Sequence, residues 1–159
     1  MKYSQEQYSK LVRQLTDFND RYQQIQLDYS KELRDYGTGE LYTPTEVHMV
    51  TRIEEAPGIT AVKIAEETYR TKSAVSQMLS KLEGKGLIYK EKDPRNGKQQ
   101  LLYVTPKGRH LSLCHKAYDE SQTAVPIQQM VDQFGMDAIE HYLAISEYIV
   151  RFYLSKRAK

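Results

Sequence analysis

Seven apolar residues near the start of the chain recur at alternating spacings of three and four, a heptad pattern sustained over three repeats. Such spacing places all seven side chains on one face of a helix, and an isolated helix has to cover a stripe of this kind. We therefore expect one long helix over residues 5–35, ending near the glycines of Gly37-Thr38-Gly39. The stripe consists of Tyr8, Leu11, Leu15, Phe18, Tyr22, Ile25 and Tyr29.

The C-terminal stretch repeats this pattern after a break predicted at Phe134-Gly135. The chain has 159 residues, about one ordinary domain, so it has little other core with which to cover two apolar stripes. Two such helices can bury their stripes against each other and against a second copy. Homodimerisation through the termini is the interpretation we favour, and a monomeric helical bundle is the alternative. The second stripe consists of Ile139, Tyr142, Ile145, Ile149 and Phe152.

Shorter elements are predicted between these ends. Thr43-Pro44-Thr45-Glu46 has the threonine, the proline and the carboxylate of a capping box, so a helix begins there and runs to about Glu55. A second, short helix ends at about Glu67, and a third runs from about Lys72 to Lys85. Two strands follow, over residues 87–92 and 99–104, joined by the basic tip Asp93-Pro94-Arg95-Asn96-Gly97-Lys98.

This order predicts a winged helix-turn-helix, a mainly α fold with a small β-hairpin wing, carried here on long N- and C-terminal dimerisation helices. The charge of the chain supports a nucleic-acid partner. The net charge is only +2, but residues 60–109 carry 11 Lys/Arg against 5 Asp/Glu, and the remainder carries 12 against 16. Basic charge concentrated in one segment indicates a nucleic-acid face, although a solvated surface can sort its charges in the same way.

The geometry of duplex DNA selects the candidate contacts. A major groove about 12 Å wide admits one helix, and the exposed side chains near its N-terminus reach the base edges. Gln77 can pair bidentately with adenine, so we expect it to carry the most sequence information. Each polar residue alone could merely keep a helix soluble, but a carboxylate-poor face beside a cationic hairpin favours DNA. The predicted contacts are Lys72, Ser73, Ser76, Gln77 and Lys81 on the third helix, and Arg95, Asn96 and Lys98 at the wing tip, suited to the minor groove.

Several motifs resemble the MarR family of bacterial transcriptional regulators. They are Thr60-Ala61-Val62-Lys63-Ile64-Ala65-Glu66, Ser73-Ala74-Val75-Ser76, Leu82-Glu83-Gly84-Lys85-Gly86-Leu87-Ile88, Asp93-Pro94-Arg95-Asn96-Gly97 and Val104-Thr105-Pro106-Lys107-Gly108. The resemblance implies a homodimer on a pseudo-palindromic operator, usually a repressor released by a ligand, a metal or an oxidant. It implies that Arg95 enters the minor groove and that Asp93 supports it through an ion pair. The expected domains are a dimerisation helix (1–36), the DNA-binding domain (41–106) and C-terminal dimerisation helices (107–159).

The effector is open at this point, and zinc or a small organic molecule are both candidates. Zinc-responsive members of the family look similar at His48, His115 and Asp119, and a fourth ligand could be Asp28 or Glu32. The alternative is that the histidines are hydrogen-bonded helix residues or line an organic-ligand cleft. The single cysteine, Cys114, is a candidate thiol sensor or a small packed residue.

Other functional classes find little support in the sequence. No Gly-rich phosphate loop, H-E-x-x-H motif or cysteine pair is present, so we do not expect an enzyme. The longest apolar run is four residues, the first residues lack an apolar signal region, and one cysteine cannot close an internal disulfide. These observations predict a cytoplasmic protein without a membrane partner. A winged helix that binds protein, as a scaffold or antirepressor, remains the rival interpretation, although its docking face would be more apolar.

Overall fold

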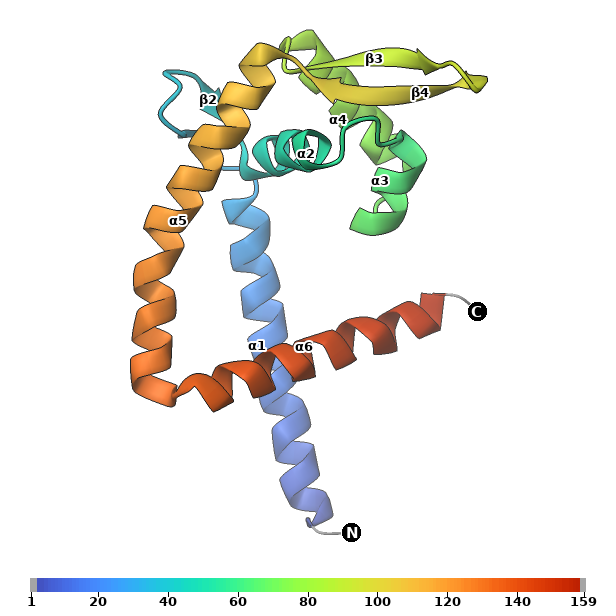
Figure 1. Cartoon of the computed structure of the whole chain (residues 1–159). Coiled ribbons are helices and arrows are strands. Elements are labelled where there is room, and N and C mark those ends of the chain that lie inside the picture. The colour runs from blue at the N-terminus through green and yellow to red at the C-terminus, as the bar shows by residue number, and fades with distance from the viewer. Residues whose placement is uncertain (1–2, 158–159) are drawn as a thin grey trace. The chain divides into compact units, whose positions relative to one another are not determined.

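The computed structural model describes residues 3–157 and shows a mainly helical chain with two small antiparallel hairpins (Figure 1). The chain divides into two compact units, Met1–His115 and Lys116–Lys159. The predicted fold class, a winged helix-turn-helix with long terminal helices, is confirmed. The elements in order are α1 (Gln5–Tyr29), β1 (Arg34–Asp35), β2 (Leu41–Tyr42), α2 (Pro44–Glu55), α3 (Ala61–Thr68), α4 (Lys72–Gly84), β3 (Ile88–Asp93), β4 (Asn96–Val104), α5 (Pro106–Phe134) and α6 (Met136–Arg157).

The three helices of the helix-turn-helix begin at threonine caps, of which the sequence analysis predicted the one at Thr43. Thr43 caps α2 in a reciprocal box with Glu46, and Thr60 and Thr71 cap α3 and α4 by accepting backbone N–H groups two or three residues into each helix. The turn between α3 and α4 passes through Tyr69, which takes the left-handed conformation at φ 53°. Each helix start is therefore specified locally, within four residues of its cap.

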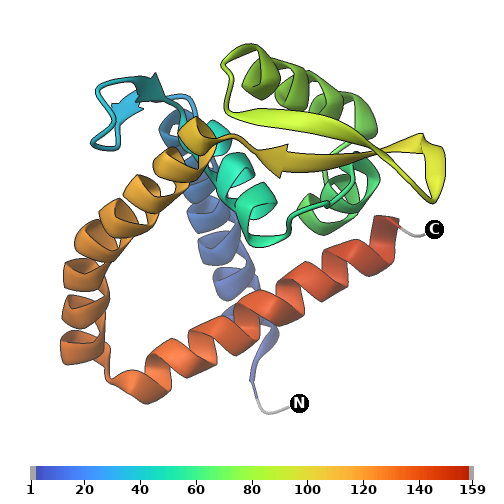
Figure 2. The same ribbon diagram turned by 45° about the horizontal axis from the view of Figure 1, so that its top comes forward.

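The wing is the β3–β4 hairpin, whose tip extends beyond α3 and α4 in both ribbon views (Figures 1 and 2). Ile88 pairs with Val104, and the register is regular as far as Lys92, where it shifts. The prediction that the second strand starts at residue 99 was wrong, because β4 begins at Asn96. The carboxylate of Asp93 accepts the backbone N–H of Arg95 at 2.8 Å, which tightens the turn and brings Asn96 opposite Asp93.

The first helix is shorter than predicted. It ends at Tyr29, the last residue of the heptad stripe, and not near residue 35. The hairpin β1–β2 follows, with Tyr36 buried at its turn. The carboxylate of Asp35 accepts three successive backbone N–H groups, from Gly37, Thr38 and Gly39, at 2.8 to 3.1 Å. This side-chain-to-backbone turn competes with helix once the apolar periodicity has stopped.

The core of the first unit is assembled from α2, α3, α4, the wing and the start of α5. Its fully buried side chains include Val47, Val50, Ile53, Ile64, Val75, Leu82, Leu87, Leu102 and Leu111. Helix α5 approaches β3 closely at Gly108, where an added Cβ would overlap the backbone carbonyl oxygen of Leu87. Thr105 accepts the N–H of Gly108 at 3.1 Å and donates to the carbonyl oxygen of Gly86 at 2.6 Å, which holds this junction together.

The second unit consists of the rest of α5 and helix α6, and the predicted break between them lies at Gly135, at φ 81°. Tyr142, Ile145 and Phe152 of the second apolar stripe are about half exposed. The stripe of α1 is equally open, since none of the 25 residues of that helix is buried. No helix within residues 3–157 is both long and apolar enough to cross a membrane.

Candidate nucleic-acid interface

The outer face of α4 carries the predicted base-reading residues, and all of them are exposed. Thr71 caps the helix by accepting the N–H of Ala74 at 3.2 Å, while Val75, Leu79 and Leu82 are buried on the opposite face. Burying these three side chains turns the polar face outward. The residues exposed on it are Lys72, Ser73, Ser76, Gln77, Ser80 and Lys81, and the first carboxylate is Glu83 in the last turn, which is exposed and pairs with Lys90 at 2.6 Å.

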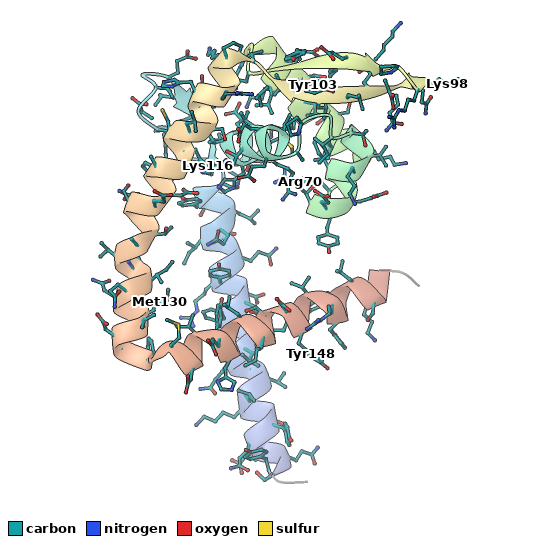
Figure 3. All side chains as sticks on the ribbon, in the orientation of Figure 1. Arg70, Lys98, Tyr103, Lys116, Met130 and Tyr148 are labelled. Atoms are coloured by element: carbon teal, nitrogen blue, oxygen red, sulfur yellow. The ribbon has the colours of Figure 1, made fainter. Side chains whose placement is uncertain are left out.

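The wing tip presents the second predicted group. Arg95, Asn96 and Lys98 are exposed, and Lys98 lies at the outer end of the hairpin (Figure 3). Asn96 accepts the N–H of Lys98 at 3.3 Å. Asp93 contacts Arg95 through the backbone, so it shapes the turn and leaves the guanidinium open to other partners. Among the described residues no ion pair joins these two side chains, in contrast to what the family resemblance implies.

A groove of about 700 Å³ lies between α3 and the wing. Lys63 and Glu66 line it from α3, and Asn96, Lys98 and Gln100 line it from β4. The groove joins the wing tip to the start of α3, so the exposed polar surface of the first unit extends beyond α4 and the tip of the hairpin.

A buried carboxylate lies behind the far end of α4. Glu46 is fully buried, and its Oε1 lies 2.6 Å from the ammonium of Lys85 and 3.1 Å from that of Lys81. Burial raises the pKa of Glu46, but the ammonium of Lys85, the N–H of Thr43 and the ammonium of Lys81 outweigh it, so the net pKa is lowered. Lys81, a predicted DNA contact, is therefore already paired within the protein.

The sequence showed only the capping role of Glu46. Its ion pairs could not be found there, because they join residues 35 to 39 positions apart. The one local signal is that Lys81 and Lys85 are four apart on the same helix and need a counter-charge between them. Tyr42 extends this charged layer: burial and the hydrogen bond to Glu40 raise the pKa of its hydroxyl, and the ammonium of Lys85 lies 5.0 Å from the centre of its ring.

The structure brings two of the predicted metal ligands together. The rings of His48, on α2, and His115, on α5, have their centroids 4.9 Å apart, and His115 is buried. Thr51 lies 3.4 Å from Nδ1 of His115 and accepts a hydrogen bond from the buried Ser112 at 3.2 Å. The sequence did not indicate these two hydroxyl groups. They form a polar cluster inside an otherwise apolar junction of α2 and α5.

The two suggested fourth ligands, Asp28 and Glu32, lie in contacts within their own helix or loop. Asp28 accepts hydrogen bonds from Gln24 at 3.2 Å, and Glu32 forms an ion pair with Arg34. Neither belongs to the group of potential metal ligands formed by His48, His115 and Asp119. Asp119 follows His115 by four residues on the continuous helix α5. Cys114 is partly exposed, with its sulfur 3.7 Å from Nε2 of His110.

A hollow of about 320 Å³ lies beside His48. It is lined by Thr45, His48, Met49, Arg52, Thr68 and Arg70, and Figure 3 shows Arg70 at the end of α3. Arg52 donates to Glu67 at 2.8 Å, which fixes its guanidinium at the rim. Two guanidinium groups and two threonines around one hollow favour an anionic occupant.

Comparison with known proteins places this interface in a family. Residues 42–99, from β2 to the wing, match the model of the MarR family. The chain carries a MarR-family domain. A relative, the uncharacterized HTH-type transcriptional regulator YhjH of Bacillus subtilis (strain 168), is 29% identical over 119 residues, which cover 72% of this chain and 66% of YhjH. The chain thus matches just under two thirds of that relative's length.

Solved MarR-family structures share the fold over nearly the whole chain. FabT of Streptococcus pneumoniae, solved in complex with DNA, is 19% identical with a TM-score of 0.65, covering 93% of this chain and 98% of FabT. ZitR of Lactococcus lactis, described as a zinc-responsive MarR-family member, is 19% identical with a TM-score of 0.67, covering 90% of this chain and 99% of ZitR. At this identity the likeness concerns the fold, and it includes the terminal helices outside the matched domain.

Proposed function

We propose that the protein is a sequence-specific, double-stranded DNA-binding transcriptional regulator. One observation carries the proposal: from Lys72 to Lys81 the exposed face of α4 holds lysine, serine and glutamine without a carboxylate, next to an exposed cationic wing. Helix α4 would enter a major groove with Lys72, Ser73, Ser76 and Gln77 toward the bases, and Arg95, Asn96 and Lys98 would follow the adjacent minor groove. FabT, which has the same fold, was solved in complex with DNA, and this supports DNA as the partner.

The regulator acts as a homodimer in this proposal, on a pseudo-palindromic operator. Helix α1 exposes its whole apolar stripe, with Leu15 and Phe18 about half accessible, and α6 exposes most of its own stripe. Water-exposed stripes of this length are unfavourable, and a second copy of the same helices is a partner of matching shape. Two copies would present their α4 helices one DNA turn apart, roughly 34 to 36 Å.

The test is selection of bound sequences from a random duplex pool with the full-length protein. We expect a palindrome whose half-sites lie one helical turn apart, bound with a steep dependence on salt because lysines and arginines displace counterions. Recovery of no duplex, or affinity that does not change with salt, would favour the rival class of protein-binding scaffold or antirepressor. A single unpaired half-site would contradict the dimer.

Replacing Arg95 with alanine tests the wing. We expect affinity for the selected duplex to fall roughly tenfold or more, because an exposed guanidinium lost from the minor groove removes a charge-assisted contact. The protein should remain dimeric by light scattering, since Arg95 lies at the outer turn of the hairpin. Unchanged affinity in a gel-shift titration would remove Arg95 from the interface.

An effector that changes the spacing of the two α4 helices would release the operator, which makes the protein an effector-responsive repressor. We propose zinc as this effector, held by His48, His115 and Asp119. The support is the approach of the two imidazole ring centroids to 4.9 Å and the hydroxyl of Thr51, 3.4 Å from Nδ1 of His115, which would help to orient that ring. Because His48 lies on α2 and His115 on α5, metal binding would constrain these helices together.

Zinc should therefore raise the melting temperature, by an amount that corresponds to about 2.7 kcal/mol at a hundredfold excess over Kd, and change the DNA affinity. The variants His48→Ala and His115→Ala should lose both effects. If zinc alters neither quantity, the metal proposal fails. The hollow lined by Arg52 and Arg70 then favours a small organic anion, which can be tested by the same melting assay with aromatic and aliphatic carboxylates.

A further inference from the structure

The buried carboxylate of Glu46, on α2, contacts lysines at the end of α4, and the proposed DNA contacts do not explain it. Its Oε2 accepts the backbone N–H of Thr43 at 2.8 Å, which completes the cap of α2. Its Oε1 faces away from that cap, toward the ammonium groups of Lys85 at 2.6 Å and Lys81 at 3.1 Å. One carboxylate at the start of α2 thus contacts two lysines from the last turn and the end of α4.

Capping alone does not require a charge at this position. Glutamine serves equally well as the third residue of a capping box, because its side-chain oxygen accepts the same N–H. A fully buried carboxylate, by contrast, loses its hydration, and ion pairs often only offset that loss. The negative charge of Glu46 therefore has a role beyond capping, and its partners are the ammonium groups of Lys81 and Lys85.

Both lysines remain within reach of solvent. The side chain of Lys81 is 55% exposed and that of Lys85 is 32% exposed, so each ammonium lies between the buried carboxylate and the surface. Lys81 is on the same exposed face as Gln77, one turn further along α4. Without Glu46, this end of the helix would present two full positive charges to any nearby phosphate; with it, the net charge of the cluster is one.

We propose that Glu46 is a specificity-determining residue for DNA recognition: it cancels one of the two charges of Lys81 and Lys85 and holds both ammonium groups back from phosphates. The inference rests on the proposed function of α4 in the major groove. Phosphate attraction is independent of sequence, whereas base contacts are not. The carboxylate limits phosphate attraction at the C-terminal end of α4. Discrimination between sequences then depends on the base contacts of the residues near the N-terminus of that helix.

The variant Glu46→Gln tests this in the full-length protein, since it retains the shape and the cap but removes the charge. Binding to the selected palindrome and to a scrambled duplex is measured between about 50 and 200 mM salt. We expect the salt slope for the scrambled duplex to steepen by about 0.9 per protomer, its affinity to rise several-fold, and the ratio of the two affinities to fall by roughly tenfold.

The double variant Glu46→Gln, Lys85→Gln restores the net charge of the cluster and provides the second measurement if the single variant folds poorly. It should return the salt slope and the affinity ratio toward those of the unaltered protein. Glu6→Gln, in the first turn of α1, removes the same charge outside α4 and should leave both quantities unchanged. Thermal melting of every variant shows whether the fold is retained.

The outcomes separate the inference from the proposed function. If Glu46→Gln weakens binding to both duplexes alike with an unchanged salt slope, or if Lys85→Gln fails to reverse its effect, the carboxylate has only a structural role and the inference is overturned. If the unaltered protein binds no duplex, or does not distinguish the palindrome from the scrambled sequence, the proposed function itself fails, and the inference with it.

Discussion

Replacing Phe18 with lysine should separate the protein into monomers and lower its affinity for the operator by roughly a hundredfold or more. Phe18 lies in the middle of the apolar stripe of α1, 46% exposed and stacked on Tyr22 with ring centroids 5.8 Å apart. In a symmetric dimer the substitution occurs twice in the same interface, so two ammonium groups would be buried without partners. A monomer then binds one half-site only. It loses the raised effective concentration with which the second subunit of a dimer binds the second half-site.

Sedimentation or light scattering gives the oligomeric state, and a gel-shift titration gives the affinity. Ser9→Lys is the matched control, because it adds the same charge to the opposite face of α1 at an exposed position. It should leave the dimer intact. A Phe18→Lys protein that stays dimeric and binds normally would show that the stripe of α1 is not the dimer interface.

Gly108→Ala should destabilise the folded protein by about 2 to 3 kcal/mol, which for a chain of this size lowers the melting temperature by roughly 4 to 12 °C. The reason is steric. Gly108 is buried in the first turn of α5, where an added Cβ would overlap the carbonyl oxygen of Leu87 and lie 3.3 Å from the Cβ of Val104. Because the obstacle is backbone, α5 has to move away from β3, and the Thr105 contacts at this junction are strained with it.

Gly84→Ala separates this clash from the general effect of removing a helical glycine. A Cβ at Gly84, the last residue of α4, would meet no atom within 4 Å. Alanine is favoured over glycine in a helix by about 1 kcal/mol or less, so this control should match or slightly exceed the stability of the unaltered protein. Equal melting temperatures for the two alanine variants would contradict the close approach of α5 to β3.

Much of the fold could be predicted because its boundaries are local. The threonine caps of α2 and α4 lie within four residues of the groups they satisfy, and the break at Gly135 needs only one left-handed residue. The errors occurred where a side chain competed with the pattern. The side chain of Asp35 bonds to backbone N–H groups in the β1–β2 hairpin, which stands where the end of the first helix was expected. The side chain of Asp93 tightens the turn of the wing, and β4 begins three residues before the predicted start at residue 99.

The candidate interface follows the same division. The exposed face of α4 was predictable because burying Val75, Leu79 and Leu82 leaves only one side of the helix for Lys72, Ser76 and Gln77. The contacts of Glu46 were not predicted, and the approach of His48 to His115 was expected only from the family resemblance and not from spacing. They join residues more than 30 positions apart, and sequence spacing carries no information about such pairs without the packing that brings them together.

The sequence by itself determined the order of elements, the two apolar stripes and the basic face, because helix periodicity, caps and charge act over a few residues. Only the tertiary structure decided which charged side chains are paired within the protein. Lys81 is the same residue type as Lys72 and is likewise exposed on α4, yet Lys81 is paired with a fully buried carboxylate from another helix. The electrostatics of a surface residue depend on what lies beneath it, and that is set by the packing of distant segments.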